Sequence, residues 1–333
     1  MNLGQSTNDV YPTAMRLAVL SLLRDHLYPA LRDVEDAFFS KGEEFDDVLK
    51  SGRTHLQDAA PIRLGQELVA YGRALSKTRN FLKKAAQSLH ELGIGGSAVG
   101  TGLNTSPEYA GLMVKNLSEQ TKFPLIKSED LREAMQSMRP MAEVSAALRN
   151  IALEMNRISN DLRLLSSGPK TGLAEISLPS VAPGSSMMPG KVNPSMLEMM
   201  NMVCYQVIGC DLAVCTAVQA GQLELNVMMP VISFNLCFMI QILGNSLREV
   251  KERCIDGIQA NAERCRMYAE ASMGLATALS PVIGYVHAAE VAKEALEKGK
   301  TLVEVVEEKG LLSKEELREI LDPTKMTEPE TPF

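Results

Sequence analysis

The sequence has 333 residues, of which 45% are hydrophobic and 5% aromatic, and it contains no tryptophan. A chain of this length can bury a large core, with room for a smaller second domain. The net charge of -7 excludes a general nucleic-acid-binding surface, which needs an excess of Lys and Arg, but it still permits a local basic site for a small anion.

A polar segment, Gln5-Ser6-Thr7-Asn8-Asp9, precedes the first helical stretch, which is predicted near residues 10–40. Asn8 or Asp9 is suited to cap this helix, since short polar side chains can accept the unpaired N–H groups of its first turn. A helix N-terminus also favours a bound carboxylate. A helix cap and an anion site are therefore both consistent with this segment.

A second polar break, residues 51–61, precedes a helical stretch near residues 61–92 and contains Thr54 and His55. The chain has four histidines, and a lone histidine is more often structural than catalytic. Here, however, His55 follows a threonine in a polar segment, which also fits a hydrogen-bonding role toward a ligand. Both interpretations stay open at this point.

The Gly-rich residues 93–107 begin with Gly93-Ile94-Gly95-Gly96-Ser97-Ala98, which matches a relaxed dinucleotide-binding fingerprint. That fingerprint functions when it follows a strand and opens the helix of a βαβ unit. Here it follows a helical stretch, and no alternation of strands and helices surrounds it. We therefore do not expect a nicotinamide site.

The strongest periodic signal lies in the helical stretch near residues 129–167. Its apolar residues recur in alternating steps of four and three, the heptad spacing of a helix in a left-handed bundle. The residues of this seam are Val144, Leu148, Ile151, Met155, Ile158, Leu162 and Leu165. Pro140 should bend or interrupt the stretch, and Gly168-Pro169 should end it.

The next break, residues 168–194, contains the run GSSMMPGKVNP at positions 184–194. Successive backbone N–H groups of such a loop can surround an anion, and Lys191 can supply a positive charge to a carboxylate. A flexible loop can also close over a substrate. A surface turn is the competing interpretation, because Gly, Pro and Ser often form one.

Two further helical stretches are predicted near residues 193–218 and 224–256, the second containing Pro230. The uncharged run from Leu225 to Leu247 is long enough to cross a bilayer, but it carries several polar residues. We interpret it as a helix buried on all sides by other helices, with a membrane span as the alternative. After about Gly257 the pattern shortens into small amphipathic helices. The prediction is an all-α protein, with a central helical-bundle domain at 1–257 and a small helical C-terminal domain at 258–333.

The six cysteines form no CxxC pair, and no histidine lies beside them at metal-ligand spacing. They are Cys204, Cys210, Cys215, Cys237, Cys254 and Cys265. Most lie in apolar stretches, so we expect buried free thiols in a reducing cytoplasm and no metal site.

Five segments resemble sequence blocks of the aspartase/fumarase superfamily, and together they cover essentially the whole chain. They are 51–67, 96–105, 160–169, 184–194 and 220–230. The run GSSMMPGKVNP is similar to the signature loop of that superfamily. The run GQLELNVM (221–228) resembles the aspartase branch more than the fumarase branch, and the 320–330 segment is similar to the end of some bacterial aspartases. Met229, by contrast, stands where aspartases usually have Glu.

The resemblance implies a long-helix bundle and a homotetramer in which three subunits build each active site. It implies elimination of ammonia from L-aspartate to give fumarate, without a cofactor. Two alternatives stay open: a class II fumarase, which hydrates fumarate to L-malate, and an inactive helical assembly module. Neither nucleic acid nor membrane is expected as a partner.

The same resemblance implies that Ser185 and His55 are catalytic, Ser185 being the base that removes a proton beside one substrate carboxylate. That carboxylate becomes an enediolate, and the amine then leaves. A serine hydroxyl is a weak base, so positive charge and backbone donors must activate it, and Lys191 with the loop N–H groups are the candidates. By this resemblance, Ser6, Thr7 and Ser186 hold the carboxylate that becomes the enediolate. Lys191, Thr54 and Asn193 hold the other carboxylate. Asn8 and His55 face the leaving amine, and Glu198 orients His55.

Family chains carry an N-terminal domain before the Gln-Ser-Thr-Asn block, whereas this sequence begins almost on that block. The family's N-terminal domain supplies another Thr-containing substrate loop. We therefore expect weak or absent activity from residues 1–333 alone.

Overall fold

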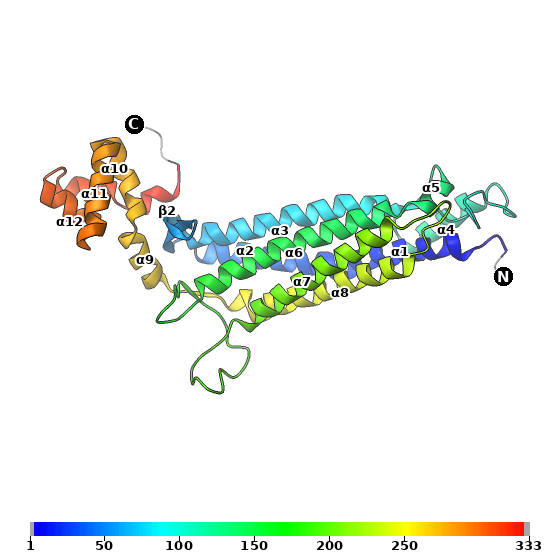
Figure 1. Ribbon diagram of the computed structural model, residues 1–333, viewed down its shortest axis with the longest axis horizontal. Coiled ribbons are helices and arrows are strands. Elements are labelled where there is room, and N and C mark those ends of the chain that lie inside the picture. The colour runs from blue at the N-terminus through cyan, green and yellow to red at the C-terminus, as the bar shows by residue number, and fades with distance from the viewer. Residues whose placement is uncertain (1–2, 330–333) are drawn as a thin grey trace. The chain divides into compact units, whose positions relative to one another are not determined.

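The computed structural model describes residues 3–329, so residues 1–2 and 330–333, including the end of the 320–330 segment, lie outside the described residues. By its internal contacts the chain divides into two compact units (Figure 1). The first contains the residues up to Ala37, Gly72–Asp161 and Ser180–Ile255, and the second contains Phe38–Tyr71, Leu162–Pro179 and the residues from Asp256 onward. The domain boundary predicted after residue 257 stays a prediction, because the second unit also takes in two earlier stretches.

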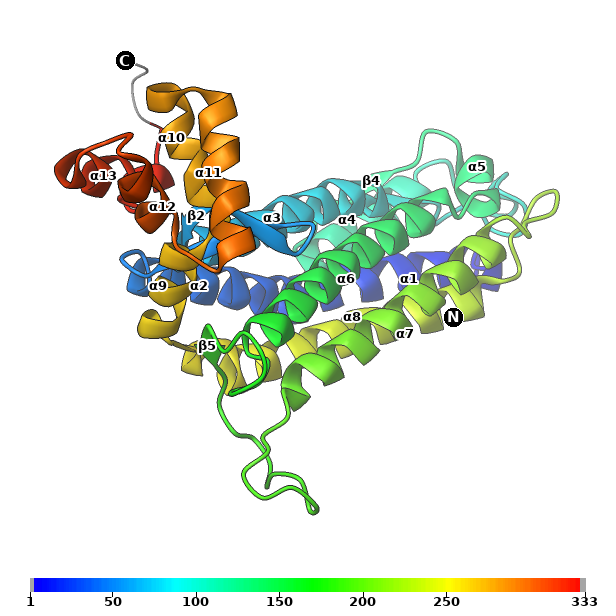
Figure 2. The same cartoon turned by 60° about the vertical axis from the view of Figure 1, so that its left-hand side comes forward.

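The first unit is a bundle of long helices, which lie side by side in Figures 1 and 2. Its elements, some of which continue into the second unit, are α1 (Thr7–Leu22), a π-helical turn (Leu23–Leu27), α2 (Tyr28–Glu44), α3 (Leu64–Ala86), a 3-10 turn (Gln87–His90), β3 (Glu91–Leu92), α4 (Tyr109–Thr121), β4 (Ile126–Lys127), α5 (Leu131–Gln136), α6 (Arg139–Leu165), α7 (Ser195–Val218) and α8 (Met229–Arg253). The two-residue strands β3 and β4 pair in parallel. The long helices confirm the predicted all-α bundle.

The second unit combines a β-hairpin with short helices. Beside its parts of α2, α3 and α6, its elements are β1 (Leu49–Thr54), β2 (Gln57–Arg63), β5 (Ile176–Ser177), β6 (Gln259–Ala260), α9 (Ala262–Ala271), α10 (Ala276–Ile283), α11 (Tyr285–Lys298), α12 (Leu302–Lys309) and α13 (Lys314–Ile320), with 3-10 turns at Ile255–Gly257, Met273–Leu275 and Lys325–Thr327. β1 pairs antiparallel with β2, and β5 pairs antiparallel with β6. An aliphatic core that includes Leu279, Val291 and Val305 joins α10–α13.

The heptad seam predicted in α6 is buried along its whole length. Every one of its seven residues is at most 4% exposed, so the seam faces the core as its spacing indicates. α6 ends at Leu165, shortly before Gly168-Pro169, as predicted. Pro140 interrupts the stretch as expected: α5 ends at Gln136, and Pro140 is the second residue of α6. In that position proline removes no helical hydrogen bond.

The helix predicted from residue 224 begins at Met229 instead, with Pro230 in its first turn. The prediction that this helix is buried on all sides is wrong for the single chain. Leu236 and Ile240 are fully buried, whereas Val231 is 46% exposed and Phe234 66% exposed. Within residues 3–329, α8 packs most closely on α1, α7 and the π-helical turn, and its opposite face carries the exposed Val231 and Phe234. By length and apolar composition, α7 and the segment Met229–Gly257 are both able to cross a membrane, a criterion that core helices of soluble proteins also meet.

All six cysteines are free thiols, as predicted. Cys204, Cys210, Cys254 and Cys265 are buried, while Cys237 is half-buried and Cys215 is exposed. Burial raises the pKa of the Cys204, Cys254 and Cys265 thiols to about 12. These thiols are therefore neutral at physiological pH and behave as small apolar side chains.

Candidate active site

The signature loop, residues 184–194, folds back on itself around Ser185. The Ser185 N–H donates to the Lys191 carbonyl at 3.0 Å, and the Lys191 N–H donates to the Met188 carbonyl at 3.1 Å. The Ser185 Oγ accepts the N–H groups of Met187 at 3.2 Å and Met188 at 3.1 Å. Two amide dipoles thus point at the hydroxyl oxygen, where they would stabilise a negative charge.

Two glycines permit this loop conformation. A Cβ atom at Gly184 would lie 2.5 Å from the Lys191 carbonyl oxygen, and Gly190 has a φ of +82°, which other residues rarely adopt. The side chains of Ser186, Lys191 and Asn193 are exposed on the same loop. The segment is therefore a surface loop with an ordered backbone, and its role in binding substrate stays a prediction.

Helix α1 begins at a polar cap that contains three predicted substrate contacts. Ser6 is the N-cap: its Oγ accepts the Asn8 N–H at 3.2 Å, and its own N–H donates to Asp9 Oδ1 at 3.0 Å. The predicted cap role thus holds for Asp9 as the third residue of a capping box, but the N-cap itself is Ser6. Within the part of the chain that the structure describes, the Ser6 hydroxyl accepts a hydrogen bond and donates none, and Thr7 is exposed, so this helix N-terminus is able to hold a carboxylate.

Asp9 also joins the start of α1 to the Gly-rich segment. Its fully buried carboxylate accepts the N–H groups of Gly95 at 2.9 Å and Ser97 at 3.1 Å, and the neighbouring Asn8 Nδ2 donates to the Ala98 carbonyl at 2.9 Å. These two amides are therefore paired within the protein and are not available to a bound phosphate. This link was not predicted from the sequence. The feature of the sequence related to it is an acidic residue, Asp9, three positions after the N-cap Ser6.

Replacement of Asp9 by alanine is expected to lower the free energy of unfolding by about 2–4 kcal/mol, because the Gly95 and Ser97 amides lose their acceptor. Equilibrium urea unfolding measures this change, at one fixed protein concentration because assembly shifts apparent stability. Asp33→Ala, at an exposed position of α2, is the matched control and should change stability by less than about 0.5 kcal/mol. An Asp9→Ala variant as stable as the unaltered protein would contradict this assignment.

Thr54 and His55 lie at the tip of the β1–β2 hairpin in the second unit, a hairpin that the sequence analysis did not predict. Thr54 pairs with Gln57, and the two loop residues His55 and Leu56 have φ angles of +56° and +62°. Two left-handed residues define a type I′ turn, which usually contains Asn or Gly, so His55-Leu56 carries no recognisable turn signal. Both Thr54 and His55 are exposed, which leaves His55 no part in the core; its catalytic role stays a prediction.

Glu198, predicted to orient His55, lies in the first turn of α7 directly after the signature loop. It belongs to the first unit, whereas His55 belongs to the second. The proposed relation between the two residues is therefore not tested within this chain.

The start of α1 and the signature loop lie at opposite ends of the bundle in the first unit (Figures 1 and 2). The loop leads into α7 at Ser195, whereas Tyr11 of α1 bonds Ser233 at the start of α8, with 2.8 Å between their hydroxyl oxygens. The intervening α7 has 24 residues, and its length is therefore about 36 Å. A single chain does not bring Ser6, Thr7 and Asn8 to Ser185.

Comparison with known proteins relates the chain to lyases over nearly its whole length. A family model described as "Lyase" matches residues 1–209, and one described as "Fumarase C C-terminus" matches residues 275–328. Aspartate ammonia-lyase from Bacillus subtilis is 48% identical over 329 residues, which cover 99% of this chain and 69% of that protein. Aspartate ammonia-lyase from Escherichia coli is 46% identical, with the same coverage.

Solved structures agree with these sequence matches. A fumarate lyase:delta crystallin from Brucella melitensis superposes with a TM-score of 0.95 at 48% identity, over 98% of this chain and 71% of that chain. A class II fumarase from Schistosoma mansoni superposes with a TM-score of 0.94 at 36% identity, over 99% of this chain and 72% of that chain. With its helical bundle, its signature loop and these relatives, the chain belongs to the aspartase/fumarase superfamily of lyases.

Proposed function

We propose that this protein is an aspartate ammonia-lyase, which eliminates ammonia from L-aspartate to give fumarate. The observation that carries this proposal is the 43–48% identity to aspartate ammonia-lyases over 99% of the chain. The class II fumarase structure is more distant, at 36% identity. The geometry of the signature loop is consistent with the chemistry, since it supplies a serine oxygen with two amide donors.

In the proposed mechanism Ser185 acts as an alkoxide base. Its Oγ takes a proton from C3 of L-aspartate, and the electron pair of the C–H bond moves into the adjacent carboxylate to form an enediolate. Collapse of the enediolate returns that pair to form the C2=C3 double bond. As this double bond forms, the C2–N bond breaks, and its electron pair leaves with the substrate's ammonium nitrogen as ammonia.

The donors around Ser185 explain how a serine could serve as this base. The N–H groups of Met187 and Met188 already bond the Oγ, so they would stabilise its deprotonated form without reorganisation. Lys191 belongs to the same loop, and its carbonyl accepts the Ser185 N–H. In the proposed mechanism its ammonium group adds positive charge near the substrate. The stabilised alkoxide is the physical basis of the proposed proton transfer.

We further propose that the active site is shared between copies of the chain in a homotetramer. Two observations support this: one chain separates the start of α1 from the signature loop by about the length of α7, and α7 and α8 carry large exposed apolar residues. Leu212 is 69% exposed and Phe234 is 66% exposed. Helices of a second copy packed antiparallel on these faces would bury them and bring the two ends together.

Phe234→Glu is expected to convert most of the tetramer to smaller species at micromolar concentration, because a buried unpaired charge opposes association. Sedimentation velocity measures the change. Leu296→Glu on α11, at a residue 68% exposed, is the control and should leave the tetramer intact. If Phe234→Glu stays fully tetrameric, the proposed interface on α8 is incorrect.

The reaction itself is tested by following fumarate absorbance with the protein expressed from its own genomic locus. Fumarate formed from L-aspartate and not from L-malate is the expected result. The reverse preference would identify a class II fumarase, the second candidate, which the Schistosoma mansoni superposition favours. Turnover of neither acid would favour the non-catalytic assembly module.

We also propose that the enzyme is cytoplasmic and that its apolar helices pack against other copies of the chain rather than lipid. Nucleic acid is not proposed as a partner. The six free thiols are those expected in a reducing compartment. Of the apolar 18-residue stretch within α7, 39% is already buried inside the chain. For the corresponding stretch within Met229–Gly257 the buried share is 44%. These observations support helices of a soluble assembly.

A further inference from the structure

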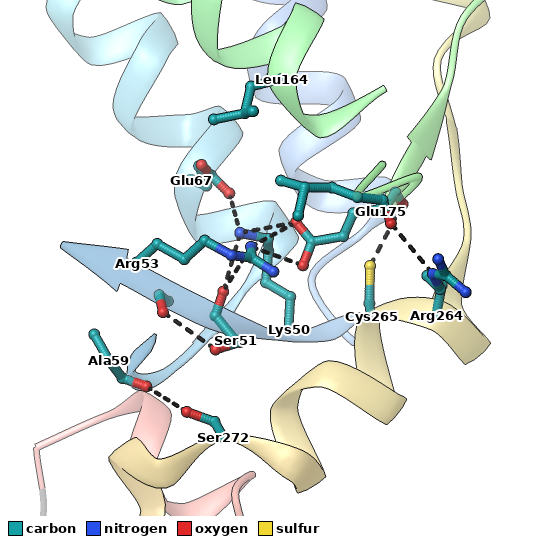
Figure 3. A network of polar contacts seen from close by, with 12 residues as sticks. Lys50, Ser51, Arg53, Ala59, Glu67, Leu164, Glu175, Arg264, Cys265 and Ser272 are labelled. Atoms are coloured by element: carbon teal, nitrogen blue, oxygen red, sulfur yellow. Dashed lines mark hydrogen bonds and ion pairs between the residues drawn. The ribbon is translucent and has the colours of Figure 1, made fainter. Parts of the chain in front are cut away.

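A buried cluster of four charged side chains lies in the second unit, at the base of the β1–β2 hairpin (Figure 3). Glu175 Oε1 and Oε2 each accept from Arg53 Nη1 at 2.9 Å. Lys50 Nζ lies 2.9 Å from Glu67 Oε2 and 3.5 Å from Glu175 Oε2. The cluster contains two cations and two carboxylates, so its charges balance.

Glu175 is the most deeply buried member of the cluster. Its side chain is 0% exposed, against 3% for Lys50, 15% for Arg53 and 23% for Glu67. A buried carboxylate needs partners of opposite charge, because it has lost its water. Figure 3 shows the side chains of Lys50 and Arg53 pointing toward Glu175 from the hairpin.

The backbone of Glu175 is itself held in place from two sides. Its N–H donates to the Leu165 carbonyl at the end of α6 at 2.9 Å, and its carbonyl accepts the Asn261 N–H at 2.8 Å. The Cys265 thiol of α9 donates to the same carbonyl at 3.4 Å. The carboxylate is therefore presented to the hairpin from a fixed position, contributed by a part of the chain 122 residues away from Arg53.

The hairpin needs such an anchor, because its tip is exposed and strained. Arg53 immediately precedes Thr54, and His55 and Leu56 both adopt left-handed conformations that side chains rarely take. A bulge between Ser51 and Arg53 also interrupts the strand pairing there. Beside this interrupted pairing, the ion pair of Arg53 with Glu175 adds a contact to a fixed group directly before the turn residues.

We propose that Glu175 is a positioning residue, which acts through Arg53 to hold Thr54 and His55 in the orientation that the substrate requires. This inference rests on the proposed function, in which Thr54 binds a carboxylate and His55 faces the leaving amine. Glu175 does not touch the substrate. Its effect reaches the reaction through the conformation of residues 51–58.

The experiment compares three variants in the protein expressed from its own genomic locus. Glu175→Gln removes the anion and leaves the buried cluster with one unpaired cation. Arg53→Lys keeps every charge but replaces the planar guanidinium, whose Nη1 contacts both carboxylate oxygens, with a shorter side chain that ends in an ammonium. Glu270→Gln in α9 is the matched control: it makes the same chemical change in an exposed ion pair with Arg266, at 3.0 Å in the same unit.

Two readouts separate positioning from a merely structural role. In both cluster variants, steady-state kinetics per active tetramer should show a KM for L-aspartate about tenfold higher and a kcat/KM about 10–100-fold lower. Small misplacements of binding groups cause losses of this size. Hydrogen exchange of the backbone amides in residues 51–58 should be about tenfold faster. Glu270→Gln should match the unaltered protein in both readouts.

The outcomes decide between the two proposals. If the unaltered protein turns over L-aspartate and the folded cluster variants keep its KM, Glu175 is not a positioning residue, although the function stands. If the unaltered protein turns over no L-aspartate, the function fails, and the exchange of residues 51–58 alone decides whether Glu175 orders the hairpin. Recovery of both cluster variants only as unfolded protein would assign the cluster to fold stability and overturn the inference.

Discussion

Ser185→Ala is expected to lower kcat for the elimination of ammonia from L-aspartate by about 10³-fold, within the range that a general base contributes. The substitution removes the oxygen that takes the C3 proton in the proposed mechanism. KM should change by less than about threefold, because this oxygen acts in the transition state more than in substrate binding. Initial rates of fumarate formation with the protein from its own locus measure both constants.

Ser180→Ala is the matched control for this experiment. Ser180 precedes the signature loop, its exposed hydroxyl bonds the Ala182 carbonyl at 3.1 Å, and the chemical change is the same. Its kcat should equal that of the unaltered protein. The fold should also survive Ser185→Ala, since the exposed Met187 and Met188 amides can bond water instead. An unchanged kcat in a folded Ser185→Ala protein would exclude the serine-base mechanism.

Co-expression of two inactive variants, Thr7→Ala and Ser185→Ala, is expected to restore activity to about a quarter of the unaltered value. The two residues lie at opposite ends of the bundle in one chain, so a working site takes them from different copies. In randomly mixed tetramers, each active site contains an intact Thr7 with a probability of about one half and an intact Ser185 with a probability of about one half, so about a quarter of the sites contain both. Two affinity tags isolate mixed tetramers, and the fumarate assay measures their rate against either parent.

The control for this mixing experiment is co-expression of Ser185→Ala with Lys191→Ala. These residues belong to the same loop, joined by the Ser185 N–H bond to the Lys191 carbonyl, so one chain supplies both to any site. Every site then lacks one of the two groups, and no activity should return. Mixed tetramers of Thr7→Ala and Ser185→Ala that remain as inactive as their parents would contradict a site shared between copies.

The long helices and the signature loop can be predicted from local patterns in the chain, whereas α4 was not predicted. Heptad spacing is a local property, and the buried face of α6, including Leu148 and Ile151, follows from it without knowledge of any neighbour. Pro140 and Pro230 were expected inside two helical stretches, whereas the structure has each in the first turn of its helix, where proline's missing N–H removes no hydrogen bond. The loop at 184–194 was likewise recognised from its residue types alone, through its resemblance to the signature loop of the superfamily.

Contacts between distant segments, by contrast, became known from the folded chain. The bond from the Gly95 N–H to Asp9 spans 86 positions, and the ion pair of Arg53 with Glu175 spans 122. Neither has a periodic signal, because such pairs form wherever packing brings two segments together. The β1–β2 hairpin was missed for a related reason: its turn contains His55 and Leu56, whose left-handed conformation runs against their own preference and follows from the two-residue turn between paired strands.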